Sequence, residues 1–223
     1  MRTDEIAQLL APFLETPLHE MQLRAVSTHL DLLLRWNERV NLTAVRQPEE
    51  IVTRHFGESF FLARHLFPPD WRGSAADLGS GAGFPGVPIA IYAPDAQVTL
   101  IESNNKKATF LRELTRALGL AGISVFAGRA EDSSFEAVPE VVTLRGVEKF
   151  EAAVLVAASL LRDRAQAGEK REPRRLAMLV GRGQVDTAKA LVKNCTWEPP
   201  LPTPGSDNRI VLIGNLYGQG SAK

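Results

Sequence analysis

The chain has 223 residues, of which 44% are hydrophobic and 23% charged, enough for one sizeable packed domain with an appendage. Its 26 basic and 26 acidic residues cancel, so the whole-chain charge gives no support to general nucleic-acid binding. No apolar run approaches the roughly 20 residues of a membrane span, and the N-terminal residues do not resemble a signal peptide. The single Cys195 excludes an intramolecular disulfide. We therefore expect a cytoplasmic protein.

The N-terminal part, residues 1–72, is predicted to form a helical extension. Over Met21–Val40, large apolar residues recur at three- and four-residue spacing, which is typical of an amphipathic helix. A second helix is expected over Glu49–Leu66, because Pro68-Pro69 follows it and proline does not continue a helix. A short connection, Asn41–Arg46, joins the two.

From residue 73 to residue 223, short apolar runs alternate with helical patterns. Strands are expected at Ala75–Leu78, Gln97–Glu102, Ile123–Ala127, Val141–Leu144, Ala177–Val180 and Arg209–Gly214. Helices are expected at Pro85–Tyr92, Lys106–Leu118, Glu151–Leu161 and Gln184–Lys193, and the proline-rich run Pro199–Pro204 is expected to be a loop. Such alternation predicts an α/β protein with a mostly parallel, doubly wound, Rossmann-like sheet in one compact unit after the helical extension.

A glycine-rich stretch, AADLGSGAGFPG at residues 75–86, follows the first predicted strand. Four glycines fall within eight residues of it. In open parallel sheets, ligands bind beyond the carboxyl ends of the strands, and glycines let the backbone approach a ligand closely. The stretch is therefore predicted to be a cofactor-binding loop.

Two cofactor classes fit this loop. Gly81–Gly86 matches G-x-G-x-x-G, the dinucleotide pattern, and Glu102 lies 21 residues after Gly81, where it could accept hydrogen bonds from ribose hydroxyls. Asp77–Gly83 equally matches D-x-G-x-G-x-G, the loop of S-adenosylmethionine-dependent methyltransferases. The first pattern indicates a NAD-type oxidoreductase or binding protein, and the second indicates a methyltransferase.

The ends of the loop favour S-adenosylmethionine. A pyrophosphate is bound by free N–H groups at a helix N-terminus. Pro85 removes one such N–H, and the acid Asp77 would repel a pyrophosphate but suits the ammonium and sulfonium groups of S-adenosylmethionine.

Further along the chain, four features are candidates for function. Gly128–Asp132 follows the third strand, where it could meet an adenine, although it also suits a plain helix start. Arg145 ends the fourth strand, where it could bind an RNA phosphate, a base edge or a cofactor carboxylate, with a structural ion pair as the alternative. His55 could reach the same opening or act in the core, and Phe84 could pack on the cofactor or in the core. The four histidines lack metal-ligand spacing, so no metal is expected.

Several short motifs occur in an order that resembles the bacterial RsmG (GidB) family, the small-subunit ribosomal RNA guanine-N7 methyltransferases. The resemblance covers about residues 20–215. The motifs are Asn41–Thr43, Arg54–Phe56, Asp77–Gly86, Lys106 with Phe110–Arg112, Gly128–Glu131 and Val142–Arg145.

The resemblance implies a class I methyltransferase fold that uses S-adenosylmethionine. It implies that the pocket is lined by Gly79, Phe84, Ala130, Glu131 and Arg145, with Gly81 in the same loop and Glu102 beside the ribose. It also implies methylation of a guanine N7 in the decoding-region loop of 16S ribosomal RNA. We expect this RNA to be bound within the small ribosomal subunit or an assembly intermediate, with naked RNA open as the alternative. Because guanine N7 carries a lone pair and no proton, no general base is expected.

This sequence departs from the family pattern at three places. Leu144-Arg145-Gly146 stands where the family usually has S-R-A, and Glu58 stands where it often has aspartate. Residues 166–175 are longer and more basic than expected. A solvated surface loop and a phosphate-facing loop are both open for that segment.

Overall fold

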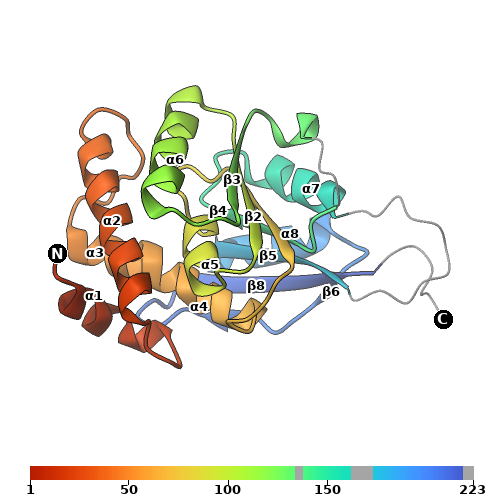
Figure 1. The fold of residues 1–223 in the computed structure, drawn as a ribbon. Helices are drawn as coiled ribbons and strands as arrows, with labels where there is room; N and C mark the ends of the chain where they lie inside the picture. The colour runs from red at the N-terminus through yellow and green to blue at the C-terminus, as the bar shows by residue number, and fades with distance from the viewer. Residues whose placement is uncertain (134–137, 162–172, 218–223) are drawn as a thin grey trace.

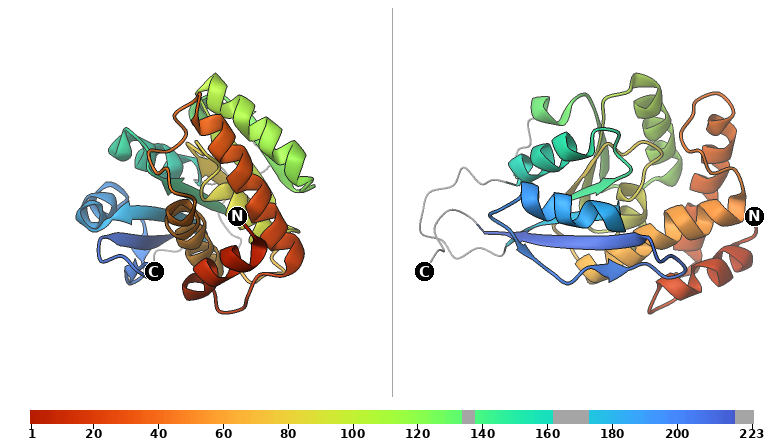
Figure 2. Two further views of the ribbon diagram at one scale, coloured as in Figure 1. Left: turned by 90° about the vertical axis from the view of Figure 1, so that its left-hand side faces the viewer. Right: turned by 180° about the vertical axis from the view of Figure 1, so that it is seen from behind.

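The computed structural model describes residues 1–133, 138–161 and 173–217. In that part of the chain, an eight-stranded sheet carries helices on both faces, and the helical extension lies along one side of it (Figure 1). Figure 2 shows the same arrangement from two further directions, with the extension packed against α5 and α6.

The extension contains α1 (Thr3–Leu10), η1 (Ala11–Phe13), α2 (Glu20–Asn37), α3 (Pro48–Ile51), η2 (Val52–Gly57) and α4 (Glu58–Leu66). The first predicted helix is α2, which begins with a capping box between His19 and Gln22. The second is present as the continuous run α3–η2–α4, in which η2 is a π-helical segment. Such wider turns often occur at functional sites, and this one carries Arg54 and His55.

The strands follow the order β3-β2-β1-β4-β5-β8-β6, with β7 also paired to β8. The bounds are β1 (Ser74–Leu78), β2 (Gln97–Glu102), β3 (Ile123–Ala127), β4 (Val141–Arg145), β5 (Arg174–Gly181), β6 (Thr196–Trp197), β7 (Leu201–Pro202) and β8 (Arg209–Leu216). Strands β1 to β5 are parallel, and β8 is antiparallel to β5. All six predicted strands are therefore present, most with slightly extended ends.

Helices cover both faces of the sheet, as predicted for a doubly wound fold. They are α5 (Gly86–Tyr92), α6 (Asn105–Leu118), α7 (Phe150–Leu160) and α8 (Val185–Leu191), with short turns η3 (Ala130–Asp132) and η4 (Arg182–Gln184). One face packs on α5, α6 and the extension, and the other packs on α7 and α8. Neighbouring residues on a strand, such as Ala75 and Ala76, belong to opposite clusters because side chains alternate across a sheet.

The prediction of a loop over Pro199–Pro204 was wrong at one point. Leu201–Pro202 forms the short strand β7 against β8. Proline lacks the N–H that a central strand needs, but an edge strand tolerates it. Two-residue strands such as β6 and β7 are also too short to give a periodic signal in the sequence.

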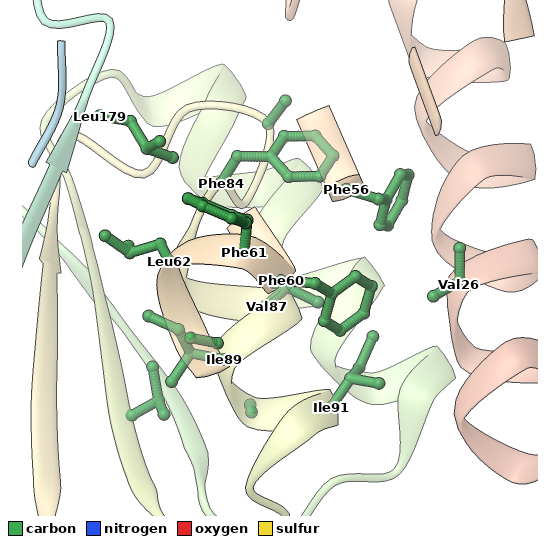
Figure 3. Packing of buried hydrophobic residues seen from close by; sticks show 14 of the residues in the cluster. Val26, Phe56, Phe60, Phe61, Leu62, Phe84, Val87, Ile89, Ile91 and Leu179 are labelled. Atoms are coloured by element: carbon green, nitrogen blue, oxygen red, sulfur yellow. The ribbon is translucent and has the colours of Figure 1, made fainter. Parts of the chain in front are cut away.

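The extension and the sheet share one hydrophobic cluster. Phe56 and Phe60 of the extension belong to the same cluster as Val87 and Ile89 of α5, and Figure 3 shows them in one packed region with Phe84. The domain boundary at residue 72 stays a prediction. What the packing establishes is that the extension is fixed against the glycine-rich segment, and it therefore helps to position that segment.

Candidate cofactor and substrate site

The glycine-rich loop needs glycine for its backbone conformation. Gly79, Gly81 and Gly83 have φ values of 71°, 55° and 89°, in the left-handed region where side chains are strained. The loop turns back over the sheet, and the N–H groups of Gly79 and Ser80 donate to the carbonyl of Ile101 at 2.9 and 3.0 Å. This places the loop over the carboxyl ends of β1 and β2.

The fourth glycine serves packing. Gly86 begins α5, and a Cβ at this position would overlap Leu100 and lie 2.8 Å from Oδ2 of Asp77. Glycine therefore lets α5 start directly against the sheet.

Asp77 connects three elements at the base of the loop. The side chain is fully buried at the end of β1. Its Oδ2 accepts a hydrogen bond from the N–H of Gly86 at 3.1 Å, and its Oδ1 accepts one from the hydroxyl of Thr143 on β4 at 2.8 Å. Burial raises the pKa of Asp77 to about 6, against the hydrogen bonds from Thr143 and Gly86, which lower it. The carboxylate thus holds the loop, β4 and α5 together.

The first turn of α5 has no N–H left to offer to a phosphate. Gly86 donates to Asp77, and Val87 donates to the carbonyl of Gly83 at 2.9 Å. Pro88 has no N–H, and Ile89 donates to the carbonyl of Pro85 at 3.1 Å. A dinucleotide pyrophosphate is normally bound by these groups, so this geometry fits a cofactor without phosphate.

Glu102 lies beside the loop, at the carboxyl end of β2. Its Oε2 accepts a hydrogen bond from the N–H of Gly81 at 2.9 Å, and its Oε1 accepts one from the N–H of Asn104 at 2.7 Å. After the neighbouring strand β3, the turn η3 places Ala130 in the core and Glu131 at the exposed surface. These residues follow β2 and β3, which end at the same edge of the sheet.

Arg145, at the end of β4, forms an ion pair with Glu58 of α4. The Arg145 Nη2 lies 3.0 Å from Oε2 of Glu58, and both side chains are largely buried, 11% and 4% exposed. The same Nη2 donates to the backbone carbonyl of Arg54 at 2.7 Å. The guanidinium carbon lies 5.9 Å from the centre of the Phe84 ring, within cation–π range. The ion pair that the sequence analysis left as the structural alternative for Arg145 is therefore present.

Leu144 and Gly146, the two departures from the family pattern beside Arg145, each have a structural reason in this chain. Gly146 has a φ of 60°, a conformation that alanine would adopt only with strain. Leu144 is buried in the cluster that packs on α7 and α8. The longer carboxylate at position 58 is the partner of Arg145.

Phe84 is surrounded by residues of the extension. Its ring is stacked on the imidazole of His29 at 4.8 Å and meets the ring of Phe56 edge-on at 4.8 Å. Figure 3 shows Phe56 and Phe84 side by side. Phe84 is 5% exposed, so its core-packing role is present here, and its role as a cofactor contact stays a proposal.

Sequence reasoning missed His29, which belongs to α2. It is fully buried, and its Nε2 lies 2.8 Å from the carbonyl oxygen of Ala82 in the loop. Burial lowers the pKa of His29 to about 4, so the ring is neutral and donates this hydrogen bond. The available signal was its place on the apolar face of the helix, three residues after Val26 and four before Leu33.

His55 is buried close to Phe84 and near the charge of Arg145. Its Nε2 is 2.7 Å from the hydroxyl of Thr43, and its ring centre is 5.1 Å from that of Phe84. Burial, followed by the charge of Arg145, lowers the pKa of His55 to about 2. His55 is therefore neutral near pH 7.

The two buried histidines predict a loss of stability in acid. In the unfolded chain, both bind a proton as the pH falls below about 6.5, whereas the folded state stays neutral. Each lowers the free energy of unfolding by about 2 kcal/mol between pH 7 and pH 5, and the raised pKa of Asp77 opposes this by about 1 kcal/mol. His29→Gln keeps a donor in place of Nε2 and should lose about 2 kcal/mol of this pH dependence. Urea unfolding at pH 7 and pH 5 measures it, and an unchanged pH dependence in the variant would contradict the assignment.

Three predictions concern other parts of the chain. Across the described residues, no group of three or more metal-ligating side chains is placed to hold a metal ion. No helix there is long and apolar enough to cross a membrane. Of the basic segment 166–175, residues 166–172 lie outside the described residues, and Arg174 and Arg175 belong to β5.

The fold is that of a Rossmann-like class I methyltransferase. Its marks are the strand order, the antiparallel β8, and a glycine loop that contacts an acid at the end of β2. A structure from Aquifex aeolicus, described as a SAM-dependent methyltransferase, superposes with a TM-score of 0.56 at 12% identity, over 69% of this chain and 87% of that one. TYW2 of M. jannaschii, in complex with AdoMet, gives 0.51 at 15% identity, over 72% and 74%. These likenesses concern the fold.

The sequence identifies the family. A family model described as GidB, rRNA small subunit methyltransferase G, matches residues 22–168, and the chain belongs to this family. Ribosomal RNA small subunit methyltransferase G of Xylella fastidiosa (strain M23) is 46% identical over 134 residues, 60% of this chain. The protein of the same name from Stenotrophomonas maltophilia (strain K279a) is 48% identical over 134 residues. The match spans 61% of the length of each of these relatives.

Proposed function

We propose that this protein transfers a methyl group from S-adenosylmethionine to N7 of a guanine in the decoding-region loop of 16S ribosomal RNA. The observation that carries the proposal is the family match over residues 22–168. The first turn of α5 supports the proposal as well. Its N–H groups already donate hydrogen bonds within the protein, which favours a cofactor without phosphate.

The residues around the loop fit S-adenosylmethionine. Gly79 and Gly81 would let the backbone lie against the cofactor, and Glu102 would accept hydrogen bonds from the ribose hydroxyls. Ala130 and Glu131 would border the adenine. The buried charge of Asp77 would favour the ammonium and sulfonium groups through the low-dielectric interior. When bound, the cofactor supplies a methyl group made electrophilic by its sulfonium.

The reaction needs alignment rather than proton removal. Guanine N7 attacks through its own lone pair, so the residues of the site must hold the base in line and exclude water. The reaction therefore does not require His55 to act as a base. His55 is neutral and forms a hydrogen bond with Thr43. Its proposed role is to shape the opening between the extension and the loop.

Arg145 is proposed to orient the substrate. Glu58 and the carbonyl of Arg54 both bind Nη2, which fixes the plane of the guanidinium. The remaining N–H groups can then meet a base edge or a phosphate. The charge of Glu58 also offsets that of Arg145, so the opening does not oppose the positive charge that develops on the guanine ring.

The substrate is proposed to be presented within the small ribosomal subunit or an assembly intermediate. The net charge of zero supports recognition by shape and context more than by general attraction to RNA. The sharpest test of the cofactor is calorimetric titration of the purified protein with S-adenosylmethionine and, separately, with NAD. We expect binding of the first only. Binding of NAD without binding of S-adenosylmethionine would reject the methyltransferase in favour of an oxidoreductase or a dinucleotide-binding protein.

A further inference from the structure

A groove of about 860 Å³ is lined by none of the glycine-loop residues described above. Its walls come from α1 and η1, from η2, and from the connection between β7 and β8. Gln8 and Pro12 line one wall, Thr53 and Arg54 line the second, and Arg209 lines the third. The methyl-transfer site does not account for this groove.

The groove opens next to the substrate opening. Arg209 begins β8 and is paired with Gly181 at the carboxyl end of β5, so this wall lies at the same edge of the sheet as the glycine loop. Glu58 lines the groove and is also the ion-pair partner of Arg145. The guanidinium of Arg145 in turn lies over Phe84 of the loop. A continuous path of contacting side chains therefore connects the groove to the cofactor loop.

The groove carries an excess of positive charge although the whole chain is neutral. Glu58 is paired with Arg145, and Glu50 is paired with Arg54. Arg209 has no ion pair within the described residues. Among the residues that line the groove, two arginines, Arg54 and Arg209, accompany one carboxylate, that of Glu58.

The charges of these arginines affect the pKa of a neighbouring side chain. Arg145, Arg54 and Arg209 each help to lower the pKa of His55 after the larger effect of burial. A site with this charge, with polar groups such as Asn208 and Thr53 on its walls, suits an anionic strand with hydrogen-bonding oxygens.

We propose that this groove binds the phosphate backbone of the RNA strand next to the target guanine, with Arg209 and Arg54 as the phosphate contacts. The inference rests on the proposed function. It adds a second RNA contact, which would position the strand so that the guanine reaches the opening beside Arg145. Phosphate contacts of this kind fix position and carry no base specificity.

The test is Arg209→Gln in the full chain, with Arg116→Gln as the matched control. Arg116 is an exposed arginine near the carboxyl end of α6, a helix that begins after β2, so it lies toward the opposite edge of the sheet. The probes are naked 16S RNA and small ribosomal subunits that lack the modification. Binding is measured over a range of salt concentrations, and the KM and kcat of methyl transfer are measured for each probe.

We expect Arg209→Gln to weaken binding to naked 16S RNA about tenfold and to reduce the salt slope by about 1, as one lost phosphate contact predicts. The KM for RNA should rise with kcat little changed, S-adenosylmethionine binding should be unchanged, and Arg209→Lys should restore most of the affinity. Arg116→Gln should behave as the unchanged protein.

Two results would overturn the inference. One is equal RNA affinity and salt slope for Arg209→Gln and Arg116→Gln. The other is weaker binding to whole subunits but not to naked RNA, which would indicate a ribosomal protein as the partner. Failure of the proposed function itself would look different, because the unchanged protein would then methylate neither probe.

Discussion

Asp77→Ala is expected to abolish S-adenosylmethionine binding and to lower the free energy of unfolding by about 2–5 kcal/mol. The substitution leaves the buried N–H of Gly86 and the hydroxyl of Thr143 without their acceptor. The glycine loop and the start of α5 would then lose their connection to the sheet. Urea unfolding and calorimetric titration measure the two effects.

Asp77→Asn separates the structural role of this residue from its charge. The amide oxygen can still accept from Gly86, and the amide nitrogen can donate to the hydroxyl of Thr143, so the loop should keep its shape. Only the negative charge is removed. We expect near-normal stability at pH 7 with about tenfold weaker S-adenosylmethionine binding. Unchanged affinity in this folded variant would limit Asp77 to a structural role.

Arg145→Ala should lower the free energy of unfolding by about 3–5 kcal/mol, because it leaves the buried carboxylate of Glu58 unpaired. It should also reduce methyl transfer strongly, because the guanidinium at the substrate opening is lost. The single variant mixes the two effects, so activity must be measured at a temperature where unfolding experiments show the variant to be folded.

The double variant Arg145→Met with Glu58→Met separates the loss of stability from the loss of methyl transfer. Replacing both members of a buried ion pair by apolar side chains of similar size is often close to neutral for stability. We expect the double variant to be about as stable as the unchanged protein, to bind S-adenosylmethionine, and still to transfer methyl groups poorly. Normal methyl transfer by this variant would remove Arg145 from the mechanism.

Local patterns in the sequence were sufficient to predict much of the fold. Alternating apolar runs and helical patterns gave the six main strands, and the glycines at 79, 81 and 83 marked backbone that side chains rarely adopt. The place of Glu102 at the end of the second strand was also predicted, but its hydrogen bond with Gly81 was not. These features depend on residues close in sequence or on neighbouring strands.

The contacts made by the extension could not be predicted in this way. Arg145 and Glu58 are 87 positions apart, and His29 meets Ala82 across 53 positions. Nothing in either local sequence specifies its partner. Asp77 and Phe84 were predicted as cofactor contacts. In the structure, Asp77 holds the loop to the sheet and Phe84 packs it against the extension. Contact of either residue with the cofactor stays a prediction.

The most direct test of the proposed function is to map N7-methylguanine in 16S ribosomal RNA. The RNA would come from a bacterial strain whose own family member has been deleted and which then receives this protein. We predict that a single N7-methylguanine returns in the decoding-region loop, and that much less of it forms with the folded double variant at positions 58 and 145. If the protein is present and binds S-adenosylmethionine but no N7-methylguanine returns there, the proposed reaction is contradicted.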